Sequence, residues 1–347
     1  MPINQALHAA LLLLHTNYVI YCDRTVKGGY CEFRTQNERN AMKQEMIEMT
    51  HIEFEAMLKR LGPEIRRAMT WAIEIIREKA ANLELEGKQA YDREKTDLVT
   101  DADKAAQVVY AWMFKALFPG VGLIGEEDGL KKPCTIVVDG KLVAIHVTID
   151  PADGTKALAR KMSYGVGTMV AVVLGDEIIA SYVGDVNTGE IYGFAPGMPP
   201  TRTRFAVTTP LEPDTARLLA NCYVMLDNIP DYYPDNLARC VKRPAIGGLF
   251  KDIDVIGASI GTRAARLWKG EIAAMVLEPC FATPWDVTPV LGMCRKLGFV
   301  HIGLNKATGK AEIFDPGILT EVSAEKLPFI VVTHEHYTPQ IIAALNA

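Results

Sequence analysis

Most of this 347-residue chain is predicted to adopt a mixed fold that combines α/β and α+β patterns. Three observations predict it. A long helical repeat of apolar residues begins at Met49, pairs of strand-like segments follow it, and helix-like and strand-like segments alternate towards the C-terminus. With 49% hydrophobic residues, the chain can bury one large core or two joined cores.

The first of these elements is a helix that begins near Met49. Pro63 lies inside the repeat, so two helices or one kinked helix would both fit. The preceding residues differ, with two strand-like segments (18–22 and 30–33) around Gly28-Gly29 and then a polar stretch. We therefore predict an N-terminal extension over residues 1–48, in which no candidate site residue lies. The apolar residues of the helical repeat are Phe54, Leu58, Ile65, Met69, Ile73 and Ile76.

The elements expected after this helix divide the core into two halves, 49–200 and 201–347. Residues 201–251 are rich in proline and turn residues, and we expect them to connect the halves. The elements predicted in the first half are a helix over 101–118, strands over 135–138 and 143–149 joined at Asp139-Gly140, strands over 166–174 and 178–183 joined at Gly175-Asp176, and a strand over 191–194. Those predicted in the second half are a helix over 263–269, a strand over 273–277 and a helix over 290–297.

Composition excludes several classes of protein. The net charge of -5 lacks the basic surplus of a nucleic-acid-binding protein. No apolar run approaches the ~18 residues that a membrane span needs. The seven cysteines include no CxxC pair, which indicates free thiols in a reducing compartment. We therefore expect a cytoplasmic protein that binds neither nucleic-acid polymers nor membranes.

Four short acidic segments are candidates for a functional site. Two precede predicted helices, one follows an apolar run, and one ends a predicted strand. They are 97–103 with Asp101 and Asp103, 125–128 with Glu126, 150–155 with Asp150 and Asp153, and Trp285-Asp286.

The segment from Asp150 to Thr155 has the clearest physical logic. A strand delivers Asp150, and Asp153 follows three residues later, close enough for both carboxylates to reach one ion. Gly154 permits a close approach of the backbone, and Thr155 can cap a helix whose N-terminus favours an anion. Hard oxygen ligands beside such a helix suit Mg²⁺ and phosphate chemistry, and the metal is required because carboxylates alone would repel a phosphate.

Each segment alone has a simpler interpretation. Asp101, Asp103 and Asp286 are good helix N-caps, residues 126–128 could form a solvated acidic loop, and Asp-Pro-x-Asp-Gly is ordinary turn chemistry. Their occurrence together in one compact order favours a shared site.

That order resembles the inositol monophosphatase superfamily, the lithium-sensitive, Mg²⁺-dependent phosphatases. Its Asp-Pro-x-Asp-Gly-Thr signature stands unbroken at 150–155, with Ala152 where the family usually has Leu or Ile. Gly125-Glu126-Glu127 precedes it, and Trp285-Asp286 begins the second signature. The resemblance covers roughly residues 49–300. It implies a layered αβαβα sandwich, usually assembled as a homodimer, in which residues 49–200 are the metal-binding half.

The resemblance also implies roles for individual residues, with two or three Mg²⁺ ions bound to a small phosphorylated substrate. Glu126, Asp150 and the carbonyl of Ala152 would bind one ion, and Asp150, Asp153 and Asp286 a second. Asp103 and Thr155 would orient and deprotonate the attacking water, with Glu126 also in the catalytic set. The residues implied to contact the substrate are Asp153, Gly154, Thr155, Gly261, Thr262 and Asp286.

Three departures from the family pattern leave the substrate open. Val287-Thr288-Pro289 replace the usual small residues after Trp-Asp and predict a tighter leaving-group side. Glu278, where the acidic residue that grips inositol would fall, lies one residue too far from Asp286. Lys156, with Arg160 and Lys161 after it, could meet a second phosphate, although a solvated basic helix face is the simpler interpretation.

Three functions therefore stand as hypotheses. The first is a phosphatase for inositol monophosphate or a similar small monoester. The second is a bisphosphate phosphatase acting on adenosine 3',5'-bisphosphate or fructose 1,6-bisphosphate. The third is a non-catalytic protein with the same fold, and the intact set of candidate residues argues against it.

Overall fold

The computed structural model of the chain describes residues 46–89, 96–305 and 307–347. Glu45–Ala347 form one compact unit. The hairpin expected over 18–22 and 30–33 lies outside the described residues. The α-helices within them are α3 (His51–Lys79), α4 (Asp101–Leu117), α5 (Thr155–Ala159), α6 (Asp235–Cys240), α7 (Ile260–Trp268), α8 (Pro284–Leu297) and α9 (Thr338–Asn346). Short 3-10 helices are η1 (Glu127–Gly129), η2 (Leu219–Asn221), η3 (Pro230–Tyr232), η4 (Pro244–Ile246) and η5 (Glu335–Tyr337).

Two large sheets form the framework of this unit. The first has eight strands in the order β13-β12-β11-β10-β9-β8-β4-β5, and the second has six in the order β15-β14-β16-β19-β17-β18. The strands of the first sheet are β4 (Gly122–Gly125), β5 (Lys131–Lys132), β8 (Ile145–Asp150), β9 (Gly167–Leu174), β10 (Glu177–Asp185), β11 (Ile191–Ala195), β12 (Met198–Arg204) and β13 (Val207–Pro210). Those of the second are β14 (Tyr223–Leu226), β15 (Asp252–Val255), β16 (Ala274–Leu277), β17 (Phe299–Leu304), β18 (Ala311–Phe314) and β19 (Ile330–His334).

Two smaller sheets complete the strands of the described residues. One has the order β1-β6-β7, and the other pairs β2 with β3 in antiparallel register. The strands are β1 (Ile47–Met49), β2 (Leu85–Gln89), β3 (Thr96–Thr100), β6 (Ile136–Val138) and β7 (Lys141–Leu142).

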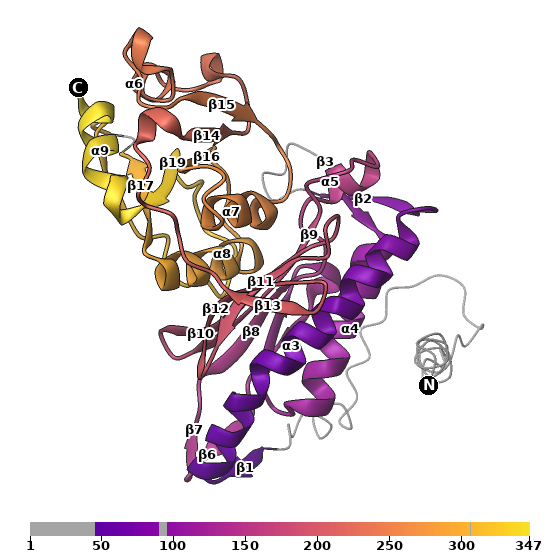
Figure 1. Cartoon of the computed structure of the whole chain (residues 1–347). Coiled ribbons are helices and arrows are strands. Elements are labelled where there is room, and N and C mark those ends of the chain that lie inside the picture. The colour runs from indigo at the N-terminus through magenta and orange to yellow at the C-terminus, as the bar shows by residue number, and fades with distance from the viewer. Residues whose placement is uncertain (1–45, 90–95, 306) are drawn as a thin grey trace, which may run out of the picture. The chain divides into compact units, whose positions relative to one another are not determined.

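Helices and sheets alternate in five layers, as the αβαβα expectation required (Figure 1). Helices α3 and α4 cover one face of the first sheet, α7 and α8 lie between the sheets, and α6 and α9 lie on the far side of the second. Strand β9 shows why the layers form, because its side chains alternate between two cores. Val170 and Val172 pack with α3 and α4, whereas Met169 and Ala171 pack with α7 and α8.

Helix α3 is one continuous helix that runs through Pro63, which decides between the two possibilities left by the sequence. Thr50 is its N-cap, and Glu53 completes a capping box: the Thr50 backbone N–H donates to Glu53 Oε2 at 2.7 Å. The predicted apolar stripe is the buried face. Phe54, Leu58, Ile65, Met69, Ile73 and Ile76 are all buried.

The turn at Asp139-Gly140 forms as predicted, with positive φ at both residues, but the strand that follows it differs. The turn joins β6 to the two-residue β7, whereas β8 starts only at Ile145 and pairs with β4 and β9 in the first sheet. The part of the run that begins at Ile145 is a largely buried strand inside the eight-stranded sheet, and a local turn signal gives no information about its partners β4 and β9.

The second half contains more regular structure than its turn-rich sequence suggested. Residues 201–251 include strands and helix α6, and β12 crosses position 200, where the two halves were divided. The mostly half-buried β12 and the exposed β13 carry few apolar residues, so the alternation of apolar and polar residues that marks a buried strand is weak there. Helix α8 begins at Pro284, so Asp286 lies in its first turn. Among the described helices, none combines the length and apolar character needed to cross a membrane.

The N-terminal boundary can be tested with two truncations. Ile47 N–H donates to Thr135 O at 2.9 Å, and Asp139 N–H donates to Met49 O at 3.2 Å, as β1 pairs with β6. Removing residues 1–44 should leave thermal unfolding unchanged. Removing residues 1–48 should cost about 1–2 kcal/mol, through lost strand hydrogen bonds, and still leave a folded, active protein. Circular dichroism and thermal melts measure both, and an insoluble 45–347 protein would contradict the expected boundary.

Candidate active site

Two parallel strands end side by side and deliver the first two acidic groups. In β4 and β8, Gly125 pairs with Ile149, and Glu126 N–H donates to Ile149 O at 3.2 Å. Because neighbouring parallel strands place their carboxyl ends at the same edge, Glu126 and Asp150 leave the sheet together. Glu126 is half-buried and Asp150 is buried.

The segment after Asp150 turns sharply and requires a glycine. Gly154 has φ +90°, in the left-handed region, and a Cβ there would lie 2.3 Å from the carbonyl oxygen of Gly165. The turn leads directly into α5, which begins at Thr155. Backbone conformation and close packing therefore both require glycine in this signature.

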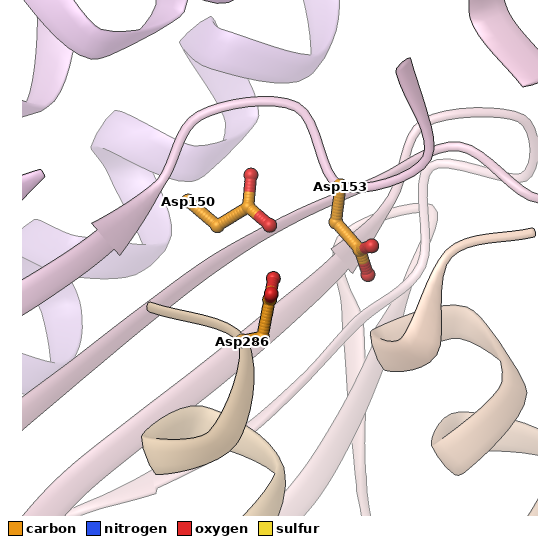
Figure 2. Close-up of side chains that lie close together, drawn as sticks. All are labelled: Asp150, Asp153 and Asp286. Atoms are coloured by element: carbon orange, nitrogen blue, oxygen red, sulfur yellow. The ribbon is translucent and has the colours of Figure 1, made fainter. Parts of the chain in front are cut away.

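Three carboxylates meet at the end of β8. Asp150, Asp153 and Asp286 each offer an oxygen, and these atoms all lie within 4.8 Å of one another. Figure 2 shows Asp150 at the end of β8, Asp153 on the segment that follows and Asp286 at the start of α8, with their carboxylates gathered around one small region. Asp286 is fixed by its helix cap, because Thr283 Oγ1 donates to Asp286 Oδ2 at 2.6 Å.

The electrostatics of the cluster indicate a missing positive charge. Burial raises the pKa of Asp150 well above its usual range, and the charges of Glu126, Asp153 and Asp286 raise it further. Asp150 Oδ1 is buried without a hydrogen-bond partner in the described part of the chain. An unpaired buried carboxylate oxygen among other carboxylates is the environment that a hard divalent cation fits.

Asp103 and Thr155 form a second arrangement beside the cluster. Thr155 Oγ1 donates to Asp103 Oδ1 at 2.9 Å and lies 3.1 Å from the carbonyl oxygen of Ala152. Asp103 is fully buried in the first turn of α4, where its Oδ2 accepts from the backbone N–H of Thr100 at 2.8 Å and from the Thr100 hydroxyl. The threonine hydroxyl thus has an acceptor for its proton, and its oxygen can accept a hydrogen bond from a water molecule.

The N-terminus of α7 contacts Asp153 directly. Gly261 N–H donates to Asp153 Oδ2 at 2.7 Å, and Thr262 N–H donates to Ser259 Oγ at 2.9 Å. Burial raises the pKa of Asp153, while hydrogen bonds from Ser259, Gly261 and Ile260 oppose that shift. Gly261 therefore contacts the cluster through the Asp153 carboxylate, and Thr262 contacts Ser259, whereas their expected contact with substrate stays a prediction.

Other acidic residues of the four segments have structural contacts. Asp101 pairs with Lys79 at 2.5 Å and accepts from Glu84 N–H at 3.2 Å. Thr100, not Asp101 or Asp103, is the N-cap of α4, and Thr283, not Asp286, is the N-cap of α8. The simpler interpretation as helix caps is therefore wrong in detail for these three aspartates, although Asp103 and Asp286 do belong to the cap hydrogen bonds.

A charged group lies at the carboxyl ends of β14 and β16, and the sequence reasoning considered its Glu278 but missed Arg263 and Asp227. Arg263 is buried on α7, pairs with Asp227 and donates to Val276 O at 2.9 Å. Glu278 is half-buried and accepts from Asn228 Nδ2 at 2.6 Å. Burial raises the pKa of Asp227, and the charge of Arg263 opposes this. No motif marks Arg263 and Asp227, since tertiary pairing alone makes them neighbours.

The structure bears on the two groups of residues that the sequence analysis considered near the substrate, residues 287–289 and the basic residues from Lys156 to Lys161. Thr288 and Pro289 are buried against β10, where Ser181 Oγ donates to Pro289 O at 2.6 Å. They therefore belong to the packing of α8 against the first sheet. Lys156, Arg160 and Lys161 are all exposed, which agrees with a solvated basic face.

Comparison with known proteins gives one family and several structures. A sequence profile described as the inositol monophosphatase family matches residues 60–309, more than half of the chain. The curated proteins searched gave no match.

Three solved structures illustrate the similarity of fold. An IMPase of Thermotoga maritima has a TM-score of 0.60 and 15% identity, covering 81% of this chain and 94% of that one. The extragenic suppressor protein suhB of Bartonella henselae has a TM-score of 0.60 and 15% identity, covering 82% and 98%. An IMPase/NADP phosphatase complexed with Mg²⁺ and phosphate has a TM-score of 0.59 and 19% identity, covering 84% and 96%. These structures share the fold described above.

The requirement for glycine at 154 can be measured against a matched turn. Gly175 also has positive φ (+59°), but no atom lies within 4 Å of a Cβ built there. Gly175→Ala should cost about 1–2 kcal/mol from its backbone conformation alone. Gly154→Ala should cost about 2 kcal/mol more, because the Gly165 carbonyl must also move. Urea unfolding of both variants measures the difference, and equal losses would contradict the role of close packing.

Proposed function

Because this chain belongs to the inositol monophosphatase family, we propose that it is a Mg²⁺-dependent phosphatase that hydrolyses inositol monophosphate or another small phosphate monoester. The family is one of phosphoric monoester hydrolases. The observation that carries the proposal is the buried Asp150, whose Oδ1 lacks a partner although three other carboxylates lie close. Such a site makes physical sense when cations neutralise it.

The donor set suits Mg²⁺. Hard oxygen donors from carboxylates and a carbonyl are the ligands that Mg²⁺ prefers. We propose that Glu126, Asp150 and the Ala152 carbonyl hold one ion, and that Asp150, Asp153 and Asp286 hold a second. The clustering of the three aspartates within 4.8 Å supports the second set. The presence of Mg²⁺ and phosphate in the similar IMPase/NADP phosphatase also supports this choice of ion.

The residues of the chain would act on water and on the phosphate. Bound Mg²⁺ would supply charge neutralisation for the phosphoryl oxygens and lower the pKa of a coordinated water. Asp103 would accept a proton through Thr155, whose hydroxyl donates to Asp103 Oδ1 at 2.9 Å. The backbone N–H groups of Gly154 and Thr155 would bind the phosphate, with Gly261 and Thr262 lining the opposite wall. Water and the monoester would yield an alcohol and inorganic phosphate by in-line displacement.

The charges around the site favour a monophosphate. Asp227 and Glu278 lie near each other directly after strands β14 and β16, and Arg263 of α7 is already paired with Asp227. The exposed Lys156 and Arg160 would contribute only ~0–1 kcal/mol each towards a second phosphate. A bisphosphate phosphatase remains the alternative, and NADP belongs in any substrate panel because one similar structure is an IMPase/NADP phosphatase. A homodimer and a cytoplasmic location stay predictions.

Neutralising Asp150 should separate stability from metal binding. Asp150→Asn removes a buried charge that its neighbours disfavour, so the metal-free protein should gain at least about 1 kcal/mol at neutral pH. Because the folded pKa is raised, wild-type stability should fall relative to Asp150→Asn as pH rises through that pKa. Mg²⁺-dependent phosphate release should fall by about 10²-fold or more.

Asp176→Asn is the control, because Asp176 is an exposed turn residue. It should change neither Mg²⁺ binding nor turnover. Calorimetric titration with Mg²⁺, thermal melts from pH 4 to 8 (about the range in which carboxyl groups with raised pKa titrate) and a phosphate-release assay give the three readings. Near-wild-type turnover of Asp150→Asn would show that the metal assignment is wrong.

Substrate scope is tested with one preparation and one set of conditions. Small monophosphates, inositol monophosphate among them, should exceed adenosine 3',5'-bisphosphate in kcat/KM, since the paired Arg263 and the exposed Lys156 and Arg160 offer a second phosphate little attraction. A tenfold preference for the bisphosphate corresponds to ~1.4 kcal/mol in the opposite direction and would replace the monophosphatase proposal with its alternative.

A further inference from the structure

The hydroxyl of Ser259 links the N-terminus of α7 to a carboxylate from a distant segment. Ser259 is fully buried and is the N-cap of α7, where its Oγ accepts from Thr262 N–H at 2.9 Å. The same Oγ donates to Asp153 Oδ2 at 2.5 Å. A hydroxyl has one proton to donate. Because Ser259 Oγ accepts from Thr262 N–H, its own proton is available for the hydrogen bond to Asp153.

Within the part of the chain that the structure describes, the hydrogen bonds to the Asp153 carboxylate come from the start of α7. Ser259 Oγ and Gly261 N–H donate to its Oδ2, and Ile260 N–H donates to its Oδ1 at 3.2 Å. Donors on both oxygens fix the rotation of the carboxylate plane as well as its position. The orientation of Asp153 towards Asp150 and Asp286 therefore depends on α7.

At the other two helix N-caps near the cluster, the cap hydroxyl also donates to an aspartate, but that aspartate belongs to the same helix as the cap. Thr100 donates to Asp103, and Thr283 donates to Asp286, each aspartate being the third residue of the helix that the threonine caps. Helix α7 has Thr262 at that position and has no acidic residue in its first turn. Asp153 supplies the missing carboxylate from outside the helix.

Close packing leaves Ser259 little freedom. A Cβ on Gly167 would lie 2.8 Å from Ser259 Oγ, and one on Gly154 would lie 3.0 Å from Ser259 N. The Ser259 N–H donates to Gly165 O at 3.1 Å. Neighbouring backbone thus encloses the hydroxyl on the side of the signature turn.

We propose that Ser259 is a positioning residue that sets the orientation of the Asp153 carboxylate for cation binding. The inference rests on the proposed function in so far as Asp153 is a Mg²⁺ ligand. It assigns to Ser259 a role towards the metal beyond capping α7. Groups that orient a metal ligand typically change metal affinity by about 10–100-fold when removed.

Two substitutions and one matched control test the proposal. Ser259→Ala removes both the cap and the bond to Asp153. Ser259→Gly removes the hydroxyl, yet glycine is almost as good as serine at an N-cap, and the φ of −44° suits either substitution. Thr50→Ala is the control, because Thr50 caps α3 with the same hydroxyl-to-carboxylate chemistry at an exposed position away from the cluster.

Calorimetric titration of the metal-free proteins with Mg²⁺, together with thermal melts, gives the result. Both Ser259 variants should bind Mg²⁺ about tenfold more weakly, whereas Thr50→Ala should lose melting temperature and keep wild-type affinity. Ser259→Gly with wild-type affinity would overturn the inference and leave Ser259 a helix cap. Failure of Ser259→Gly to fold would do the same.

The outcome for the wild type separates this inference from the proposed function. Wild-type protein that binds no Mg²⁺ would overturn both. Wild-type protein that binds Mg²⁺ and releases phosphate, beside Ser259 variants with unchanged affinity, would overturn only the role of Ser259. An increased Mg²⁺ requirement for turnover at unchanged KM for the phosphate ester would support it, because the substitution then acts on the metal and not on the substrate.

Discussion

The repulsion among buried carboxylates at the end of β8 is the constraint on which the rest of the structure depends. Asp150 lies buried near Glu126, Asp153 and Asp286, and their charges oppose its ionisation. Helix N-termini next to the carboxylates offset this repulsion. Helices α7 and α8 both begin beside the carboxylates, and α5 follows directly after the turn. Their N–H groups and cap hydroxyls stabilise negative charge, and a cation would complete the compensation.

Packing between the layers gives this arrangement its precision. Helix α7 lies so close to β9 that a Cβ on Gly261 would meet Met169 Sδ at 2.6 Å. The signature turn lies equally close to Gly165. Three separate parts of the chain, the end of β8, the start of α7 and the start of α8, are thereby fixed against one another. A preorganised site of this kind avoids reorganising its dipoles when charge develops during a reaction.

The surroundings of the cluster bear on selectivity more than on chemistry. Arg263 is buried and committed to Asp227, and Glu278 accepts from Asn228 at 2.6 Å, so the side beyond α7 carries acidic and amide groups. Lys156 of α5 and the following Arg160 and Lys161 are exposed, so their attraction for an anion is screened by solvent and salt. The acidic cluster and the charges that surround it are therefore set by different residues.

The sequence by itself determined the mixed αβ class, the long buried stripe of α3, the paired β9 and β10 and the residues of the acidic cluster, because periodicity and turn chemistry are local properties. Family resemblance supplied the order of the layers. Only the tertiary structure decided that Lys141–Leu142 pairs with β6, that α8 already includes Asp286, and that Ser259 and Arg263 adjoin the site. The positions of Ser259 and Arg263 relative to the site depend on contacts between segments as far as 106 positions apart in the chain, and hydrophobic pattern and turn residues carry no information about such partners.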